Sequence, residues 1–317
     1  MPGGASLSFT EPYQYQERIR PAEVQIIPTA RGDFQAKLSQ MELHQLTLQQ
    51  GWQSLPTVVR AALHRSRSSI MFHTGAAQPS IKVDGVDLLS DVLVLGAPGD
   101  EHFFQGASDC SWATLTLTPE TYAAAHATLV GADVDPIMRT SVIRPPPGAM
   151  ARLRALHQRV MGLIPSATGR GADPGVAKAA EHALLAAVVD CLKGEGNVTA
   201  PRLGHRNSTV VMRRLYELLD ESEGIPLYLT DVCPRLGVSR RTLHTACTEH
   251  LGLGPHRFLW LRRMQLARQA LIAADPRLAT VTAIATDLGF WELGRFSVHY
   301  KWLFGESPSA TLSRRRR

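Results

Sequence analysis

The chain of 317 residues lacks the features that mark disulfide-stabilised, secreted or membrane-spanning proteins. It has four cysteines, and no two of them form a Cys-x-x-Cys motif or another close pair: Cys110, Cys191, Cys233 and Cys247. This scarcity argues against a disulfide framework or a zinc site and predicts reduced core thiols. The longest apolar run, 183–189, is far shorter than the roughly 20 residues that cross a bilayer, and the N-terminus lacks a signal peptide's basic start and apolar stretch. We therefore expect a soluble, cytoplasmic protein without a membrane partner.

Signatures of catalysis and of cofactor binding are also missing. The chain has neither a glycine-rich phosphate loop in a strand–helix context nor a Gly-x-Ser-x-Gly segment. Glu42 and Glu101 each lie near one histidine, but no second histidine joins either of them. The histidines of this half are scattered, without a His-x-His pair: His44, His64, His73 and His102. The sequence thus predicts no catalytic residue, no metal site and no cofactor.

The net charge of +6 is unevenly distributed. Residues 1–206 carry 18 basic and 18 acidic side chains, whereas residues 207–317 carry 16 basic and 10 acidic ones. A neutral body joined to a basic C-terminal part indicates a polyanionic partner for that part alone.

The first half of the chain has the pattern of a β-rich domain. Residues 1–20 are polar and we expect them to be loose, whereas residues 21–118 contain short alternating runs separated by Gly, Pro and Asp. Asp84-Gly85 resembles a hairpin turn. The β-rich runs include Ser69–His73, Leu88–Leu95 and Ala113–Leu117. Many short strands close together favour a small barrel or sandwich.

Helical periodicity begins near Thr121 and predicts helices at Met150–Leu163 and Gly175–Leu192. The second helix carries a broad apolar stripe from Ala177 to Leu192, which packs either on its own domain or on a partner subunit. Residues 194–206 contain Gly, Asn and Pro with little apolar content, and they are interpreted as an interdomain linker.

Two similar segments follow in the basic part, 229–243 and 281–296. Each combines a short apolar-periodic helix, a glycine, a turn of three to four residues and a second helix carrying arginine. This is the pattern of a helix-turn-helix, in which the second helix enters the DNA major groove. Gly237 and Gly289 are 52 positions apart, so the unit occurs twice.

Local signals place the ends of these helices. Thr230 is predicted to cap the first bracing helix, with Pro234 in its first turn, and Ser239 to cap the recognition helix that follows. A long helix from about Pro255 to Ala273 connects the units. At about 1.5 Å per residue it spans roughly 30 Å, close to the roughly 34 Å between successive major-groove turns.

These motifs resemble the DNA-binding domain of the AraC/XylS family of bacterial transcriptional regulators. The first half shows Gly237-Val-Ser239-x-Arg241-x-Leu243, Gly252-Leu-Gly-Pro255 and Arg262-Arg263-x-x-x-Ala267-x-x-x-Leu271. The second half shows Ile284-Ala285-x-x-x-Gly289-Phe290, Phe296-Ser297-x-x-Tyr300-Lys301 and Phe304-Gly305-x-Ser307-Pro308. The variant at 289–296 is similar to the subgroup containing ethanolamine-responsive regulators.

The resemblance implies an α+β fold in which a β-rich, barrel-like (cupin-like) N-terminal domain with helices precedes an all-α domain with two helix-turn-helix motifs. We expect residues 21–193 to bind an effector and dimerise, 194–206 to link, and 207–317 to bind DNA. Cys247 stands where the family usually has Phe. Gly294 stands where a polar groove-facing residue is common, which leaves more of the contacts to Arg295.

The predicted DNA contacts lie on the outward faces of the two recognition helices. Arginine suits bidentate contact with guanine and contact with phosphate, and the tail 314–317 would add nonspecific phosphate attraction. Trp260 and Trp291 are interpreted as packing residues. The predicted DNA-binding residues are Ser239, Arg240, Arg241, His244, Thr245, Thr248, Arg295, Val298, His299 and Lys301.

The sequence therefore predicts a sequence-specific transcriptional regulator that responds to a small molecule. Its partners would be double-stranded operator DNA, an effector, a second copy of the chain in a homodimer and, as a candidate, RNA polymerase. One alternative is a metabolite-acting β-barrel enzyme fused to a DNA-binding domain, and another is a constitutive architectural DNA binder.

Overall fold

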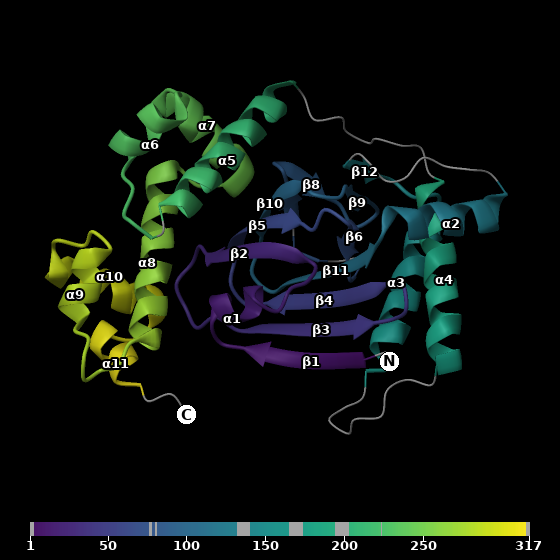
Figure 1. Cartoon of the computed structure of the whole chain (residues 1–317), viewed down its shortest axis with the longest axis horizontal. Coiled ribbons are helices and arrows are strands. Elements are labelled where there is room, and N and C mark those ends of the chain that lie inside the picture. Colours follow the sequence, from purple (N-terminus) through teal and green to yellow (C-terminus); the bar gives the residue numbers. More distant parts are fainter. Residues whose placement is uncertain are drawn as a thin grey trace.

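The computed structural model describes residues 3–75, 78–79, 81–131, 140–164, 174–193, 203–222 and 224–314 (Figure 1). Two antiparallel sheets form the N-terminal part. The helices that follow the sheets pack on one side of them, and the C-terminal helices pack on the other side (Figure 1). This is the α+β arrangement that the sequence predicts, with a β-rich domain followed by helix-turn-helix units.

The two sheets contain every strand of the described residues. The seven-stranded sheet has the order β1-β3-β4-β11-β6-β9-β12 and the five-stranded sheet the order β2-β5-β10-β7-β8. The seven-stranded sheet consists of β1 (Gly3–Phe9), β3 (Ala36–Glu42), β4 (Thr47–Gln53), β11 (Cys110–Leu117), β6 (Ser68–His73), β9 (Leu93–Gly96) and β12 (Ser141–Ile143). The five-stranded sheet consists of β2 (Ala22–Pro28), β5 (Thr57–Leu63), β10 (Glu101–Gly106), β7 (Ile81–Val83) and β8 (Val86–Leu88).

The N-terminus is built into the sheet, so the expectation of a loose segment at 1–20 is wrong. Strand β1 pairs with β3 along its whole length, from Gly3 opposite Glu42 to Phe9 opposite Ala36. Helix α1 (Pro12–Gln16) follows and buries Tyr15 completely between the sheets. The polar composition hid this because β1 is an edge strand whose side chains are largely exposed.

Two other strand predictions have different outcomes. Asp84 and Gly85 have φ values of 50° and 82° and join β7 to β8, which confirms the hairpin turn. The run Leu88–Leu95 is not one strand, because it ends β8 at Leu88 and starts β9 at Leu93, with Leu89 exposed in the intervening turn.

The helices after the sheets are α2 (Pro119–Val130), α3 (Ala149–Met161) and α4 (Pro174–Leu192). The apolar stripe of α4 packs inside its own domain. Leu184, Leu185 and Val188 belong to one buried cluster together with α3 and the seven-stranded sheet. The first of the two interpretations of this stripe therefore holds.

The C-terminal helices are α5 (Leu203–Glu221), α6 (Leu229–Leu236), α7 (Arg240–Leu251), α8 (Pro255–Ala273), α9 (Val281–Asp287), α10 (Leu293–Phe304) and α11 (Pro308–Ser313). Helix α5 starts within the predicted linker 194–206, of which residues 194–202 lie outside the described residues. The expected boundary at residue 207 therefore falls inside α5, whose apolar face belongs to the core of the C-terminal helices.

Helix α6 begins earlier than predicted. Its N-cap is Tyr228 rather than Thr230, because the carboxylate of Asp231 accepts a hydrogen bond from the backbone amide of Tyr228 at 3.1 Å. Pro234 consequently lies inside the helix, beyond its first turn.

Candidate nucleic-acid interface

Helix α7 has one buried and one uncovered face. Ser239 caps it as predicted, its hydroxyl accepting a hydrogen bond from the amide of Thr242 at 3.0 Å. Leu243, Ala246 and Cys247 are fully buried. The uncovered face carries the predicted contacts Arg240, Arg241, His244, Thr245 and Thr248, all of them exposed.

Helix α10 has the same arrangement with different side chains. Phe296, Tyr300 and Leu303 face the core, and the hydroxyl of Tyr300 donates to Thr311 of α11 at 3.0 Å. Arg295, Val298, His299 and Lys301 are exposed, as predicted.

Helix α8 holds the two units apart. Helices α6 and α7 lie at one of its ends, and α9 to α11 lie at the other (Figure 1). Its 19 residues span about 28 Å at roughly 1.5 Å per residue. This length approaches the roughly 34 Å between successive turns of the major groove.

A groove of about 820 Å³ beside α10 contains residues that the sequence did not indicate. The Arg257 guanidinium lies over the ring of Trp260 at 4.3 Å and near that of Trp302 at 5.7 Å. Trp291 is 73% exposed, so its interpretation as a packing residue is wrong. The i, i+3 spacing of Arg257 and Trp260 on α8 is the signal that could have identified the first pair.

The uncovered recognition helices belong to a domain that is docked on the five-stranded sheet. Arg60 of β5 pairs with Glu101 of β10 and, at 2.6 Å, with Asp220 of α5. Arg213 of α5 reaches Glu101 at 3.4 Å, and Gln25 of β2 donates to Asp220 at 2.9 Å. Glu101 is thereby held between one arginine of the sheet and one of α5.

An apolar contact and a backbone contact extend this docking to α7. Phe103 of β10 is fully buried between the ring of Tyr216, 5.4 Å away, and that of His250, 5.5 Å away. Gln105 donates to the carbonyl of Glu249 at 3.0 Å, next to the end of α7. The first helix-turn-helix is therefore in direct contact with strand β10.

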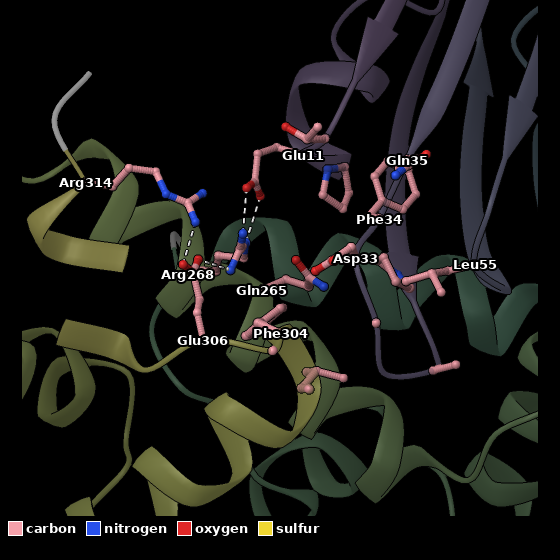
Figure 2. Close-up of a pocket in the computed structure, with 17 residues that line it drawn as sticks. Glu11, Asp33, Phe34, Gln35, Leu55, Gln265, Arg268, Phe304, Glu306 and Arg314 are labelled. Atoms are coloured by element: carbon pink, nitrogen blue, oxygen red, sulfur yellow. Dashed lines mark hydrogen bonds and ion pairs between the residues drawn. The ribbon is translucent and has the colours of Figure 1, made fainter. Parts of the chain in front are cut away.

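Ion pairs between side chains attach the second unit to the N-terminal part. Arg268 of α8 donates to both carboxylate oxygens of Glu11 at 2.7 and 2.8 Å, and to Glu306 at 3.0 Å (Figure 2). The Arg268 and Glu11 side chains are only 12% and 8% exposed. Burial alone would lower the pKa of Arg268, but these carboxylates raise it above its usual value. The ion pairs border an interdomain cleft of about 390 Å³, and the amide of Gly32 donates to the carbonyl of Leu303 nearby.

A cavity of about 110 Å³ lies between the sheets, on the face of the five-stranded sheet opposite to the C-terminal helices. Its lining is mainly apolar, with Val59, Ala61 and Phe104 among its walls. Within the part of the chain that the structure describes, the Gln49 side-chain nitrogen is buried here without a hydrogen-bond partner, and the Tyr15 hydroxyl is buried beside the indole of Trp112. An unsatisfied donor such as the Gln49 nitrogen is costly unless another group accepts from it.

His102 adds a polar group to the wall of this cavity. Its Nδ1 lies 2.8 Å from a carboxylate oxygen of Asp84. Burial lowers the pKa of His102, but Asp84, Asp100 and Glu101 together raise it above its usual value. The site therefore places an imidazole that is paired with Asp84 beside apolar walls.

Other predicted features concern the rest of the chain. All four cysteines are buried and free, and burial raises the pKa of Cys110, Cys191 and Cys247 to about 12. Among the described residues no group of three or more His, Cys, Asp and Glu could hold a metal ion. No helix of the described ranges is long and apolar enough to span a bilayer. Of the basic tail, residues 315–317 lie outside the described residues.

Comparisons with known proteins identify the family. A helix-turn-helix domain family matches residues 232–314. A segment of 102 residues, 32% of this chain and 31% of the other, is 40% identical to the probable thc operon regulatory protein of Rhodococcus erythropolis. A segment of 112 residues, 35% of this chain, is 30% identical to XylDLEGF operon transcriptional activator 2 of Pseudomonas putida and covers 71% of that protein. The chain belongs to the AraC/XylS family of DNA-binding transcriptional regulators.

A solved structure gives a likeness over more of the chain. The AraC-like transcriptional activator CuxR is 15% identical, with a TM-score of 0.43 over 84% of this chain and 95% of that one. This value is too low to support a functional conclusion. The finer likeness to ethanolamine-responsive regulators stays a prediction.

Proposed function

We propose that α7 and α10 enter adjacent major grooves on one face of operator DNA. The observation that carries this proposal is the pair of uncovered helix faces, each on a 12-residue helix, at the two ends of α8. The proposed contacts are Ser239, Arg240, Arg241, His244, Thr245, Thr248, Arg295, Val298, His299 and Lys301.

Salt dependence and footprinting test this proposal. Affinity of the full chain for its selected site should fall with a log–log salt slope of about −0.9 per phosphate contact. Footprints should show two protected blocks about 10–10.5 base pairs apart. A single protected block would contradict the use of both helices.

We further propose that a small molecule in the cavity between the sheets controls this DNA binding. Support comes from the alternation of side chains along β10. Glu101, Phe103 and Gln105 contact the C-terminal helices. His102 and Phe104 point the other way and line the cavity. One strand thus separates the cavity from α5 and α7.

The neighbouring strands repeat this division. On β5, Val59 and Ala61 line the cavity, whereas Arg60 faces α5. On β2, Ile26 lines the cavity, whereas Gln25 bonds to α5. A ligand that displaces the inner side chains would shift the surface on which the DNA-binding domain is docked, and would change the population of docked and released forms.

The lining indicates the class of effector. A cavity of about 110 Å³ is comparable with the roughly 150 Å³ engineered cavity that holds benzene. Gln49 offers an unsatisfied donor, and the His102 imidazole is a further polar group of the wall. The proposed effector is therefore compact, largely apolar and equipped with a hydrogen-bond acceptor.

A double-mutant cycle tests communication across the sheet. Thr114→Leu fills the cavity from β11, on the far wall, and Arg60→Ala weakens the docking of α5. Their effects on DNA affinity should deviate from additivity by about 0.5 kcal/mol or more, as coupled sites do. Additive effects would show that the cavity does not communicate with the DNA-binding domain.

We also propose that residues 21–193 mediate homodimerisation, with 207–317 as the DNA-binding domain and RNA polymerase as a further partner. The buried stripe of α4 leaves other surfaces for self-association, such as exposed Leu129 and Val130 of α2. Sedimentation of the full chain with Leu129→Asp against the wild type tests this surface, and an unchanged dimer would exclude it.

A further inference from the structure

We propose that α10 reads thymine through its methyl group, with Val298 as the central contact, whereas α7 reads bases by hydrogen bonds. The inference rests on the proposed function, because it assumes that both helices enter the major groove. It assigns a base chemistry to the second half of the operator.

The two recognition helices can be compared position by position. Ser239 and Glu292 are their N-caps, and each helix has 12 residues. The buried Leu243 of α7 corresponds to Phe296 of α10, and Cys247 corresponds to Tyr300. The same offset of 53 positions relates Arg241, Thr245 and Thr248 of α7 to Gly294, Val298 and Lys301 of α10, all of them exposed.

The outward centre of each helix lies opposite its buried residues. Val298 follows the buried Phe296 by two positions, which is about 200° around the helix. Thr245 has the same relation to Leu243. Val298 is 67% exposed, so a branched apolar side chain stands uncovered at the centre of the α10 face.

The positions one turn earlier also differ between the two helices. Arg241, one turn before Thr245, corresponds to Gly294, which has no side chain and where an added Cβ would meet nothing within 4 Å. Without a long side chain at this position, the backbone of α10 can approach the bases closely, and a residue as short as Val298 can reach them.

The cationic residues of α10 lie to the sides. Arg295 precedes Val298 by three positions, about 60° away around the helix, and pairs with Glu292 at 3.1 Å. Lys301 follows by three positions on the other side. Side chains placed at the edges of a groove-facing helix reach the phosphates that border the groove, which carry no sequence information themselves.

The thymine methyl is the apolar group that the four ordinary bases present in the major groove. An exposed valine at the centre of the helix, with a glycine one turn before it, matches that group and offers no donor or acceptor of its own. Guanine, which α7 can recognise through Arg241, has no such partner at Gly294.

The experiment uses the full chain and a site selected from random duplex DNA. Each thymine of the selected site is replaced in turn by deoxyuridine, which removes only the methyl group. We call the part of the site that each helix protects its block. One or two replacements in the α10 block should weaken binding about fourfold each, or about 0.8 kcal/mol at 1.4 kcal/mol per tenfold. Val298→Ala should reduce this thymine-to-uracil ratio towards one.

Matched variants separate the possible failures. Thr245→Ala, at the equivalent position of α7, should change base preference in the other block and leave the uracil effect intact. A selected site without uracil sensitivity, or a ratio that Val298→Ala does not change, overturns the methyl contact while the groove assignment stands. Selection of no site, or of one that neither variant affects, overturns the proposed function itself.

Discussion

The two helix-turn-helix units share a backbone pattern but differ in the chemistry of their outer faces and in their attachment. Helix α7 carries Arg241 and Thr245 where α10 carries Gly294 and Val298. The first unit contacts β10, beside the cavity, through Phe103 and Gln105. The second is attached through the buried ion pair of Arg268 with Glu11. One scaffold thus presents two different base-reading surfaces, and the two units are attached to the N-terminal domain by different contacts.

The largest expected effect comes from breaking the attachment of the second unit. Arg268→Ala leaves the buried Glu11 without its cation, whereas Glu306 keeps its ion pair with Arg314. Removing one partner of a buried pair should lower the free energy of unfolding by about 3–5 kcal/mol. Urea unfolding of the full chain measures it. Arg257→Ala is the control on the same helix and should have a smaller effect, because the Arg257 guanidinium lies over the Trp260 ring rather than on a buried carboxylate. Equal losses would contradict the structural role of the Arg268–Glu11 pair.

Next in size is the loss of the arginine that lies one turn before Thr245 on the outer face of α7. Arg241→Ala should weaken binding to the selected site by about 1–3 kcal/mol and relax preference at one or two base pairs of the α7 block. Competition binding with single-base variants of the site reports both changes. If the preference shifts in the α10 block instead, the helices have been assigned to the wrong halves of the operator.

A smaller effect follows from giving α10 the arginine that α7 has. Gly294→Arg replaces a glycine in the first turn of α10, where an added Cβ meets nothing within 4 Å. Because the unfolded chain loses conformational freedom, the change should stabilise the protein by up to about 1 kcal/mol. It should also introduce a preference for guanine in the α10 block, because arginine pairs with its O6 and N7. Thermal unfolding tests the stabilisation, and a new site selection tests the guanine preference. An unchanged base preference in the α10 block would mean that this position does not face the bases.

Local patterns explain why the recognition helices were predictable and their surroundings were not. The cap at Ser239 and the inward Leu243 and Tyr300 follow from residues three or four positions apart in the sequence. The contacts between Arg60 and Asp220 and between Arg268 and Glu11 join residues 160 and 257 positions apart. No periodicity records such pairings. They arise because the folded sheets present their outer face to α5 and α8.

The N-terminal strand and Trp291 show two opposite errors of prediction from local sequence. Residues 3–9 look unstructured by composition, but a partner strand satisfies their backbone groups and makes them an edge strand. Trp291 looks like a core residue by type, but it lies in the turn before α10, where no element covers it. Side-chain chemistry predicted which faces are buried within a helix, whereas the neighbours of that helix depend on the whole fold.

The smallest expected effect separates Arg295 from Arg241. Both were predicted as base contacts, but Arg295 lies on the side of α10 and its ion pair with Glu292 is more than two-thirds exposed on both sides. An exposed pair of this kind contributes at most about 1 kcal/mol, and a phosphate contact weakens binding to all sequences alike. Arg295→Ala should therefore lower affinity modestly and leave base preference in the α10 block unchanged. It should also reduce the log–log salt slope of binding by about 0.9, the value for one phosphate contact. Titrations at several salt concentrations, with the selected site and a scrambled duplex, measure all three. A changed base preference would show that Arg295 contacts bases rather than phosphate, beside Val298 in the groove.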